Sequence, residues 1–344
     1  MTSIQHLPGE IICLIAEFVF FPDTGSRYDD GITVRTLLLS TKRGNLAGVL
    51  RSLQYGANIE TPDHTQRQNV EQPLRREYKY GVSSSSVALH WAAFGGNIET
   101  VDALLSHGAN ANARCTLSTR TTDGAKVDFG HSQFELFSYC ISDMYWLSGT
   151  YARRRLARSL GVNALFFALK SSLPGKDPAA SSANRLVLCR NLIESGSSLV
   201  VRTYDGLHAL HVAAVCGLED ITDYLLTEGH CDPNVTDDEG DTALHYIGQK
   251  WSQSVPEAVI QRLQKNGADM NALNREDMTP LDLAVRHDFS GTSVRLLRHG
   301  AQWRQKTIDY YYSDDAERYF RHDVEAHGLA PPNVEGYEFD VPES

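Results

Sequence analysis

The sequence predicts an all-α solenoid of about six to seven helix-turn-helix repeats, with inserted loops and terminal capping helices. Two observations carry this prediction. A short phrase recurs along the chain, and a glycine follows it at a nearly fixed distance. The composition is 42% hydrophobic and 22% charged over 344 residues, which is typical of a chain that folds. A repeat array therefore accounts for the length better than two or three separate domains do.

The recurring phrase has the form of an amphipathic helix start. It reads "VALHWAAFGG" at 87–96, "HALHVAAVCG" at 208–217, "TALHYIGQK" at 242–250 and "TPLDLAVRHD" at 279–288, with looser copies at 36–44 and 163–171. In four copies the leucine of the phrase precedes a glycine by 19 residues, in the pairs Leu37–Gly56, Leu89–Gly108, Leu210–Gly229 and Leu281–Gly300.

Two more copies are longer. Leu244–Gly267 carries four extra residues and Leu165–Gly196 carries twelve. We expect both inserts at the turn between the two helices of a repeat, where a longer loop costs little entropy. From the glycine to the next leucine the distance is 14 or 15 residues, so the full period is about 33.

A period of this length, with T-P-L-H-x-A followed by G-A-D/N-x-N, resembles the ankyrin repeat, a turn followed by two antiparallel helices. The matching residues stand in "ALHWAAFGGNIETVDALLSHGANANA" (88–113) and in 240–274. Thr242 and Thr279 stand where a helix needs an N-cap hydroxyl. The resemblance implies that the histidine after the leucine joins neighbouring turns, in His90, His211 and His245. Gly108, Gly229, Gly267 and Gly300 are expected to end second helices in the left-handed conformation. Other copies place Leu38, Phe166 and Asp282 at the histidine position.

The expected organisation has four parts. These are an F-box-like or capping helix at 1–31, an ankyrin repeat domain at 32–303, a C-terminal capping helix at 304–328 and an acidic flexible tail at 329–344. The repeats are expected near 32–60, 83–113, 159–203, 204–236, 237–273 and 274–303. Residues 114–158 are either an insertion or a degenerate seventh repeat, and the polar stretch 64–86 is expected to be a long loop.

The N-terminal stretch "IQHLPGEIICLIAEFVF" (4–20) resembles the opening helix of an F-box, whose pattern is L-P-x-E-I followed by apolar residues. The resemblance implies that Leu7, Pro8, Ile11 and Ile15 dock on the adaptor subunit of a cullin ubiquitin ligase. An F-box needs about three helices, however, and the first repeat begins by residue 32. The alternative is an apolar cap that covers the end of the array.

The sequence does not predict an enzyme. It has no G-x-S-x-G, G-x-x-x-x-G-K or H-E-x-x-H motif, so we expect no catalytic residues, no metal ligands and no cofactors. The net charge is −11, of which residues 309–344 supply −8, and no basic face favours nucleic acid. No stretch is long and apolar enough for a membrane span. We therefore expect neither nucleic acid nor membrane as a partner, and an intracellular location, cytoplasmic and/or nuclear.

The resemblance implies a protein-binding scaffold that holds an unidentified partner protein in the groove formed by the turn tips and the first helices. The alternative is a substrate-recognition subunit of a cullin-type ubiquitin ligase, through residues 4–20. The candidate partner-binding residues, at positions counted from each leucine, are Phe94, Tyr204, Asp205, Leu207, Val215, Asp238, Glu239, Asp241, Gln249, Lys250, Arg275, Glu276, Met278 and Arg286. Their acidic members predict a negative end of the groove and a partner segment with basic residues.

Overall fold

The computed structural model describes residues 30–62, 80–84, 86–115, 117–121, 161–170, 178–202, 206–249, 255–287 and 289–311. The chain divides into two compact units, Met1–Ala209 and Leu210–Ser344. The N-terminal stretch 4–20, most of the insertion 114–158 and the acidic tail 329–344 lie outside the described residues. Among the described helices, none is long and apolar enough to cross a membrane.

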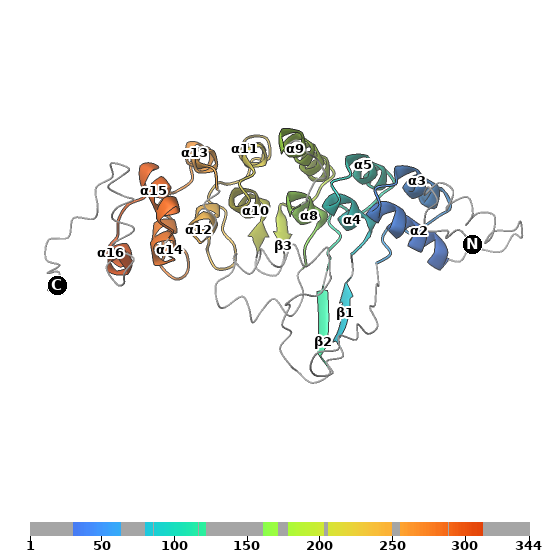
Figure 1. The fold of residues 1–344 in the computed structure, drawn as a ribbon, viewed down its shortest axis with the longest axis horizontal. Helices are drawn as coiled ribbons and strands as arrows, with labels where there is room; N and C mark the ends of the chain where they lie inside the picture. The colour runs from blue at the N-terminus through green and yellow to red at the C-terminus, as the bar shows by residue number, and fades with distance from the viewer. Residues whose placement is uncertain are drawn as a thin grey trace, which may run out of the picture. The chain divides into compact units, whose positions relative to one another are not determined.

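The described residues of the first unit form three helix pairs arranged in two layers (Figure 1). Helices α2 (Asp30–Lys42), α4 (Ala88–Phe94) and α8 (Ala164–Lys170) pack side by side as the first helices of their repeats. Helices α3 (Leu46–Gln54), α5 (Ile98–Ser106) and α9 (Pro178–Glu194) form the second layer. The second and third pairs lie within the predicted repeats, and α2 begins two residues before the predicted start of the first repeat at 32.

Small residues on the first helices and an apolar stripe on the second helices explain this packing. Ala92 and Ala93 of α4 are fully buried, so that the backbones of neighbouring helices approach closely. On α5, Val101 and Leu104 are buried at a spacing that places them on one face. In the second repeat these residues form a core between the two layers.

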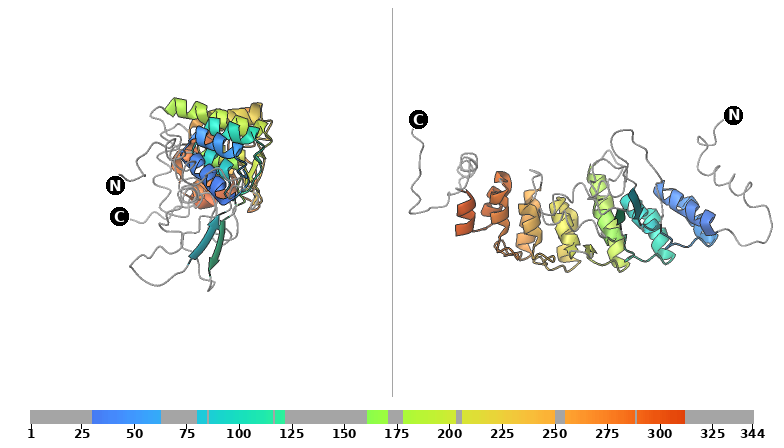
Figure 2. Two further views of the ribbon diagram at one scale, coloured as in Figure 1. Left: turned by 90° about the vertical axis from the view of Figure 1, so that its right-hand side faces the viewer. Right: turned by 90° about the horizontal axis from the view of Figure 1, so that it is seen from below.

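Two insertions meet in a small ribbon that the sequence did not predict. Strand β1 (Tyr80–Ser84) comes from the stretch expected to be a loop, and β2 (Leu117–Thr121) follows the second repeat. The strands pair antiparallel, with Tyr80 opposite Thr121 and Ser84 opposite Leu117. The ribbon projects from the side of the first unit where the turns lie (Figures 1 and 2).

The second and third repeats are direct neighbours. The side chain of Asn112 donates to the carbonyl of Gly196 at 2.7 Å and accepts from the amide of Ser198 at 2.7 Å. Main-chain bonds also join Cys115 and Val162. These contacts join the second and third repeats directly to each other.

The twelve-residue insert of the third repeat lies only partly at the turn. Helix α9 begins at Pro178 and runs for 17 residues, so the end of the insert extends the second helix. The prediction that the whole insert is a turn is wrong in this respect. Short strands β3 (Val200–Arg202) and β4 (Leu207–His208) then form a tight ribbon at the following turn.

The second unit continues the pattern with its own helices (Figure 1). The first helices are α10 (Ala209–Val215), α12 (Ala243–Gly248) and α14 (Pro280–Arg286); the second helices are α11 (Glu219–Thr227), α13 (Glu257–Lys265) and α15 (Ser290–Arg298). Helix α16 (Gln305–Tyr311) packs on α14 and is the described part of the expected C-terminal cap.

Most of the glycines that were expected to end second helices adopt the left-handed conformation. The φ angles of Gly108, Gly267 and Gly300 are 89°, 93° and 94°. Gly229 departs from the prediction, because the left-handed residue there is the next one, His230, at φ 48°. Main-chain bonds of Glu228 and Gly229 to Tyr224 show that the end of α11 continues by about one residue.

Candidate partner-binding surface

Histidines fix the turns of neighbouring repeats against one another. The Nε2 atoms of His90, His211 and His245 lie 3.0, 2.9 and 3.0 Å from the carbonyl oxygens of Ala113, Val235 and Met278. The Nδ1 atom of His90 accepts from the amide of Val87, and that of His245 accepts from the amide of Thr242. The imidazoles of His90 and His245 must therefore be neutral, with the proton on Nε2. The roles that the resemblance implied for these residues are confirmed.

Asparagine replaces this arrangement in the third repeat. Asn163 Oδ1 accepts from the amide of Phe166 at 3.1 Å and so caps the start of α8. Its Nδ2 atom donates to the carbonyl of Ser198 at 2.8 Å. One side chain thus caps the helix and joins the turn, which explains how Phe166 can stand at the histidine position.

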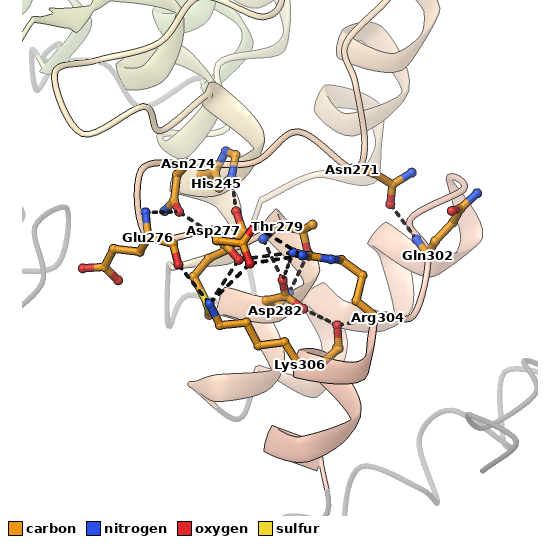
Figure 3. A network of polar contacts seen from close by, with 12 residues as sticks. His245, Asn271, Asn274, Glu276, Asp277, Thr279, Asp282, Gln302, Arg304 and Lys306 are labelled. Atoms are coloured by element: carbon orange, nitrogen blue, oxygen red, sulfur yellow. Dashed lines mark hydrogen bonds and ion pairs between the residues drawn. The ribbon is translucent and has the colours of Figure 1, made fainter. Parts of the chain in front are cut away.

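In the last repeat a buried carboxylate holds the start of the first helix and contacts the residues that follow the repeat (Figure 3). Asp282, fully buried, accepts from the amide of Thr279 at 2.8 Å, and the hydroxyl of Thr279 caps the amide of Asp282. Arg304 Nη1 lies 3.2 Å from Asp282 Oδ2, and the hydroxyl of Thr307 also donates to this carboxylate. The charge of Asp282 is therefore paired by residues at the start of the C-terminal cap.

Asparagine side chains also join the loops that follow the second helices of neighbouring repeats. Asn234 bridges to Gly267 and Asp269, at 3.0 and 2.7 Å. Asn271 accepts from the amide of Gln302 at 2.8 Å in the next repeat (Figure 3). The last asparagine of the G-A-D/N-x-N motif therefore holds one loop against the next.

The tip of the fifth repeat contains two buried carboxylates. Asp237 accepts from the amides of Glu239 and Asp241 and from the hydroxyl of Tyr246. Asp241 accepts from the side chains of Asn274 and Gln249, at 2.7 and 2.9 Å. Burial raises the pKa of Asp241, and burial lowers the pKa of the neighbouring His245. These polar groups give the tip a fixed shape.

The tip of the last repeat is held by basic residues, and two of them, Arg304 and Lys306, were not part of the prediction of a negative groove (Figure 3). Asp277 adopts a left-handed φ of 56°, and Arg304 Nη2 lies 3.2 Å from its Oδ2. Lys306 Nζ donates to the carbonyls of Glu276 and Asp277 at 2.9 and 3.1 Å. Arg286 lies 3.7 Å from Glu276. The carboxylates of Glu276 and Asp277 at this tip are therefore paired with basic side chains.

The fourteen predicted partner-binding residues separate into four groups. The exposed side chains are Asp238, Glu239, Arg275, Glu276 and Arg286. Phe94 and Gln249 are half-buried. Leu207, Val215, Asp241 and Met278 are buried, so the prediction that they are exposed to a partner is wrong. Tyr204, Asp205 and Lys250 lie outside the described residues, as do the adaptor-binding candidates Leu7, Pro8, Ile11 and Ile15.

Three of the buried residues share one register position, three before the recurring leucine. They are Leu207, Asp241 and Met278, and Ser86 and Val162 at the same position are buried too. This residue leads the chain into the helix cap and therefore faces the core of the turn. Val215 is buried for another reason. Its short side chain stays within the helix layer, whereas long side chains at the same position, such as Arg286, extend beyond it.

The first unit adds surface residues that the sequence-based prediction missed. Lys42 stands at the same register position as Phe94 and Arg286, and its Nζ lies 4.1 Å from the centroid of the Trp91 ring. Lys42 lies five residues after Leu37, but the first copy matches the recurring phrase too loosely for this position to have been recognised. Among the described residues, no group of three or more His, Cys, Asp or Glu side chains is placed to hold a metal ion.

Comparisons with known proteins agree with this architecture. The sequence model described as "Ankyrin repeats (3 copies)" matches residues 210–307, and that described as "Ankyrin repeat" matches residues 86–116. Neurogenic locus notch homolog protein 1 of Danio rerio is 31% identical over 140 residues, which is 40% of this chain and 6% of that protein. The match thus spans a small part of that relative.

A solved structure shows the same fold. The human ASB11 ankyrin repeat domain has a TM-score of 0.51 at 16% identity and covers 86% of this chain and 99% of its own. The ankyrin repeat protein EF0377 has a TM-score of 0.46 at 18% identity, covering 77% and 98%. Residues 86–116 and 210–307 are therefore ankyrin repeats, and the fold is that of an ankyrin-repeat solenoid.

Proposed function

We propose that this chain is a scaffold that binds a partner protein through the turn tips and first helices of its repeats. Ankyrin repeats generally mediate protein–protein interactions. The observation that carries the proposal is the contrast at the tips of the second unit. Their backbones are fixed by buried polar groups, while the side chains of Asp238, Glu239 and Arg275 remain exposed.

A fixed surface loses little entropy on binding, so the exposed side chains can contribute directly to affinity. Asp238 and Glu239 lie next to each other, and among the described residues no ion pair reaches Asp238. The half-buried Gln249 of the same repeat is held by Asp241 and stands beside this tip. The surface therefore favours a partner segment with basic residues, which would be attracted to this repeat before it docks.

The test is binding kinetics with a partner isolated on the wild-type protein. Asp238→Lys should slow association and flatten its salt dependence, because it reverses a charge that steers the encounter. Glu228→Lys makes the same change at the exposed end of α11, in the other helix layer, and should leave association unchanged. Equal effects of the two variants would place the partner away from the fifth-repeat tip.

The L-P-x-E-I pattern supports a second candidate function, delivery of the bound partner to a cullin ubiquitin ligase through residues 4–20. Ile11→Asp should then abolish co-purification of the adaptor and leave partner binding by the repeats intact. Absence of the adaptor from wild-type preparations, with the partner still present, would contradict this second function alone.

A further inference from the structure

Within the repeats, the residue two positions after the recurring leucine packs against the repeat before it. The ring of Phe167 meets that of His90, with centroids 5.5 Å apart. The ring of Tyr246 stacks on that of His211, with centroids 5.0 Å apart. This register position therefore faces the N-terminal side of each repeat.

The first repeat has no described repeat before it, and its residue at this position is exposed. Leu39 has 46% of its surface exposed. The corresponding Phe167, Val212, Tyr246 and Leu283 are at most 4% exposed, and Trp91 of the second repeat is half-buried. At this position four other repeats bury their side chain, whereas the described residues leave that of Leu39 uncovered at the start of the array.

A second position reaches in the same direction, five residues before the glycine that ends the second helix. Asn191 Nδ2 donates to Asp102 of the preceding repeat at 2.7 Å. Arg262 Nη1 lies 3.0 Å from Glu219 of the preceding repeat. In the first repeat Arg51 stands at this position and is exposed. The outer face of the first repeat therefore presents both an apolar side chain and a guanidinium.

The chain that precedes α2 matches this face. In the stretch 10–20, the spacing of Ile11, Ile15 and Phe18 would place them on one face of a helix, and Glu10 and Glu17 supply carboxylates. Nine residues, 21–29, separate Phe20 from Asp30, the first residue of α2. Extended, they span up to about 33 Å, and α2 is about 20 Å long. The tether is long enough for the stretch to fold back over α2.

We propose that residues 4–20 form a helix that covers the outer face of the first repeat, with Ile11, Ile15 and Phe18 over Leu39 and an acidic residue towards Arg51. The occupant is this segment of the same chain. Since the adaptor would need the same apolar residues, capping and adaptor docking exclude each other in any one molecule. The proposal goes beyond partner binding by the groove and does not depend on it.

The test is a double-mutant cycle in the full chain, read by thermal unfolding. Leu39→Asp and Ile15→Asp should each lower the first transition by several degrees, because each places a charge in a buried contact. The unfolding temperature of the double variant should be no lower than that of the more damaging single variant, since the two substitutions remove the same contact. Leu273→Asp, at a loop leucine with 52% exposure, is the control and should shift the transition by less than either.

A second readout is hydrogen exchange of the amides of residues 11–20. They should exchange at least tenfold faster in Leu39→Asp than in the wild type and in Leu273→Asp. The cap is contradicted by unchanged exchange, by fully additive shifts in the cycle, or by a Leu39→Asp shift no larger than the control. An Ile15→Asp variant that melts normally but loses the adaptor would also contradict it, and would leave adaptor docking as the role of this segment.

Discussion

The imidazole Nε2 of His245 lies 3.0 Å from the main-chain oxygen of Met278, 33 residues further along the chain. This separation is one full period of the repeat. The bond therefore joins the start of one helix pair to the turn that begins the next. Stability in such an array rests on contacts between neighbouring repeats, so damage to one contact weakens the repeats on both sides.

The recurring leucines should be among the most sensitive positions. Leu244→Ala and Leu281→Ala remove side chains that are 1% and 0% exposed, and each should lower the free energy of unfolding by about 2–5 kcal/mol. Leu273→Ala, at a leucine that is 52% exposed, should cost much less. Urea denaturation measures all three, and equal losses would show that the register of the repeat is wrong.

Acid should destabilise the protein through His90. Burial lowers the pKa of this histidine from 6.5 to about 4, outweighing its bond to Ala113, and Arg114 lowers it further. Folding favours the neutral imidazole of His90. Its contribution to the free energy of unfolding is therefore fully present above pH 6.5 and is lost as the pH falls towards 4. The shift corresponds to about 3 kcal/mol.

The measurement is urea denaturation between pH 7.5 and 4.5. His90→Gln should flatten the fall in stability over this range, whereas His107→Gln, at an exposed histidine, should leave it unchanged. A wild-type slope that survives His90→Gln would rule out this residue as the main titrating group.

Removal of Arg304 should weaken the C-terminal end more than removal of Lys306. Arg304→Ala leaves the buried carboxylate of Asp282 without its cationic partner, which costs at least about 1–3 kcal/mol. Lys306→Ala removes bonds to exposed main-chain oxygens and an ion pair of 3.9 Å, and should cost less than about 1 kcal/mol. Chemical denaturation compares the two, and the reverse order would contradict the role given to Asp282.

Replacement by alanine should change the free energy of unfolding differently at Gly267 and at Gly291. Gly267 has φ 93°, so Gly267→Ala should cost about 1–2 kcal/mol even though the space around it is open. Gly291 lies in α15 with open space and no left-handed φ, so Gly291→Ala should be neutral or stabilise by up to about 1 kcal/mol. Thermal unfolding decides, and a loss at Gly291 as large as that at Gly267 would contradict the helix-end assignment.

The sequence predicted the helix pairs because their signals are local and repeated. The leucine, the histidine and the glycine recur in phase, and each acts within one repeat or on the next. The ribbon β1–β2 could not be predicted in this way, because Tyr80 and Thr121 come from two insertions with no shared pattern. Gly229 was misassigned because one more residue in the helix moves the left-handed position to His230.

The binding surface was predicted less well than the fold. Counting from the leucine placed Asp238 and Arg286 correctly on the surface, but it placed Met278 and Asp241 there too. Which side of a turn a residue faces depends on how the chain enters the helix, and single-sequence periodicity does not contain that information. The basic residues that balance Asp277 come from Arg304 and Lys306, beyond the last repeat, and no repeat pattern points to them.

Site-specific photo-crosslinking tests the central claim most directly. A photoreactive residue replaces Arg286, which is exposed on a first helix, or Gln261, which is exposed on a second helix of the same unit. With a partner isolated on the wild-type protein, crosslinks should form from position 286 and not from position 261. Crosslinks from position 261 alone, or equal yields from the two positions, would contradict a partner held by the turn tips and first helices.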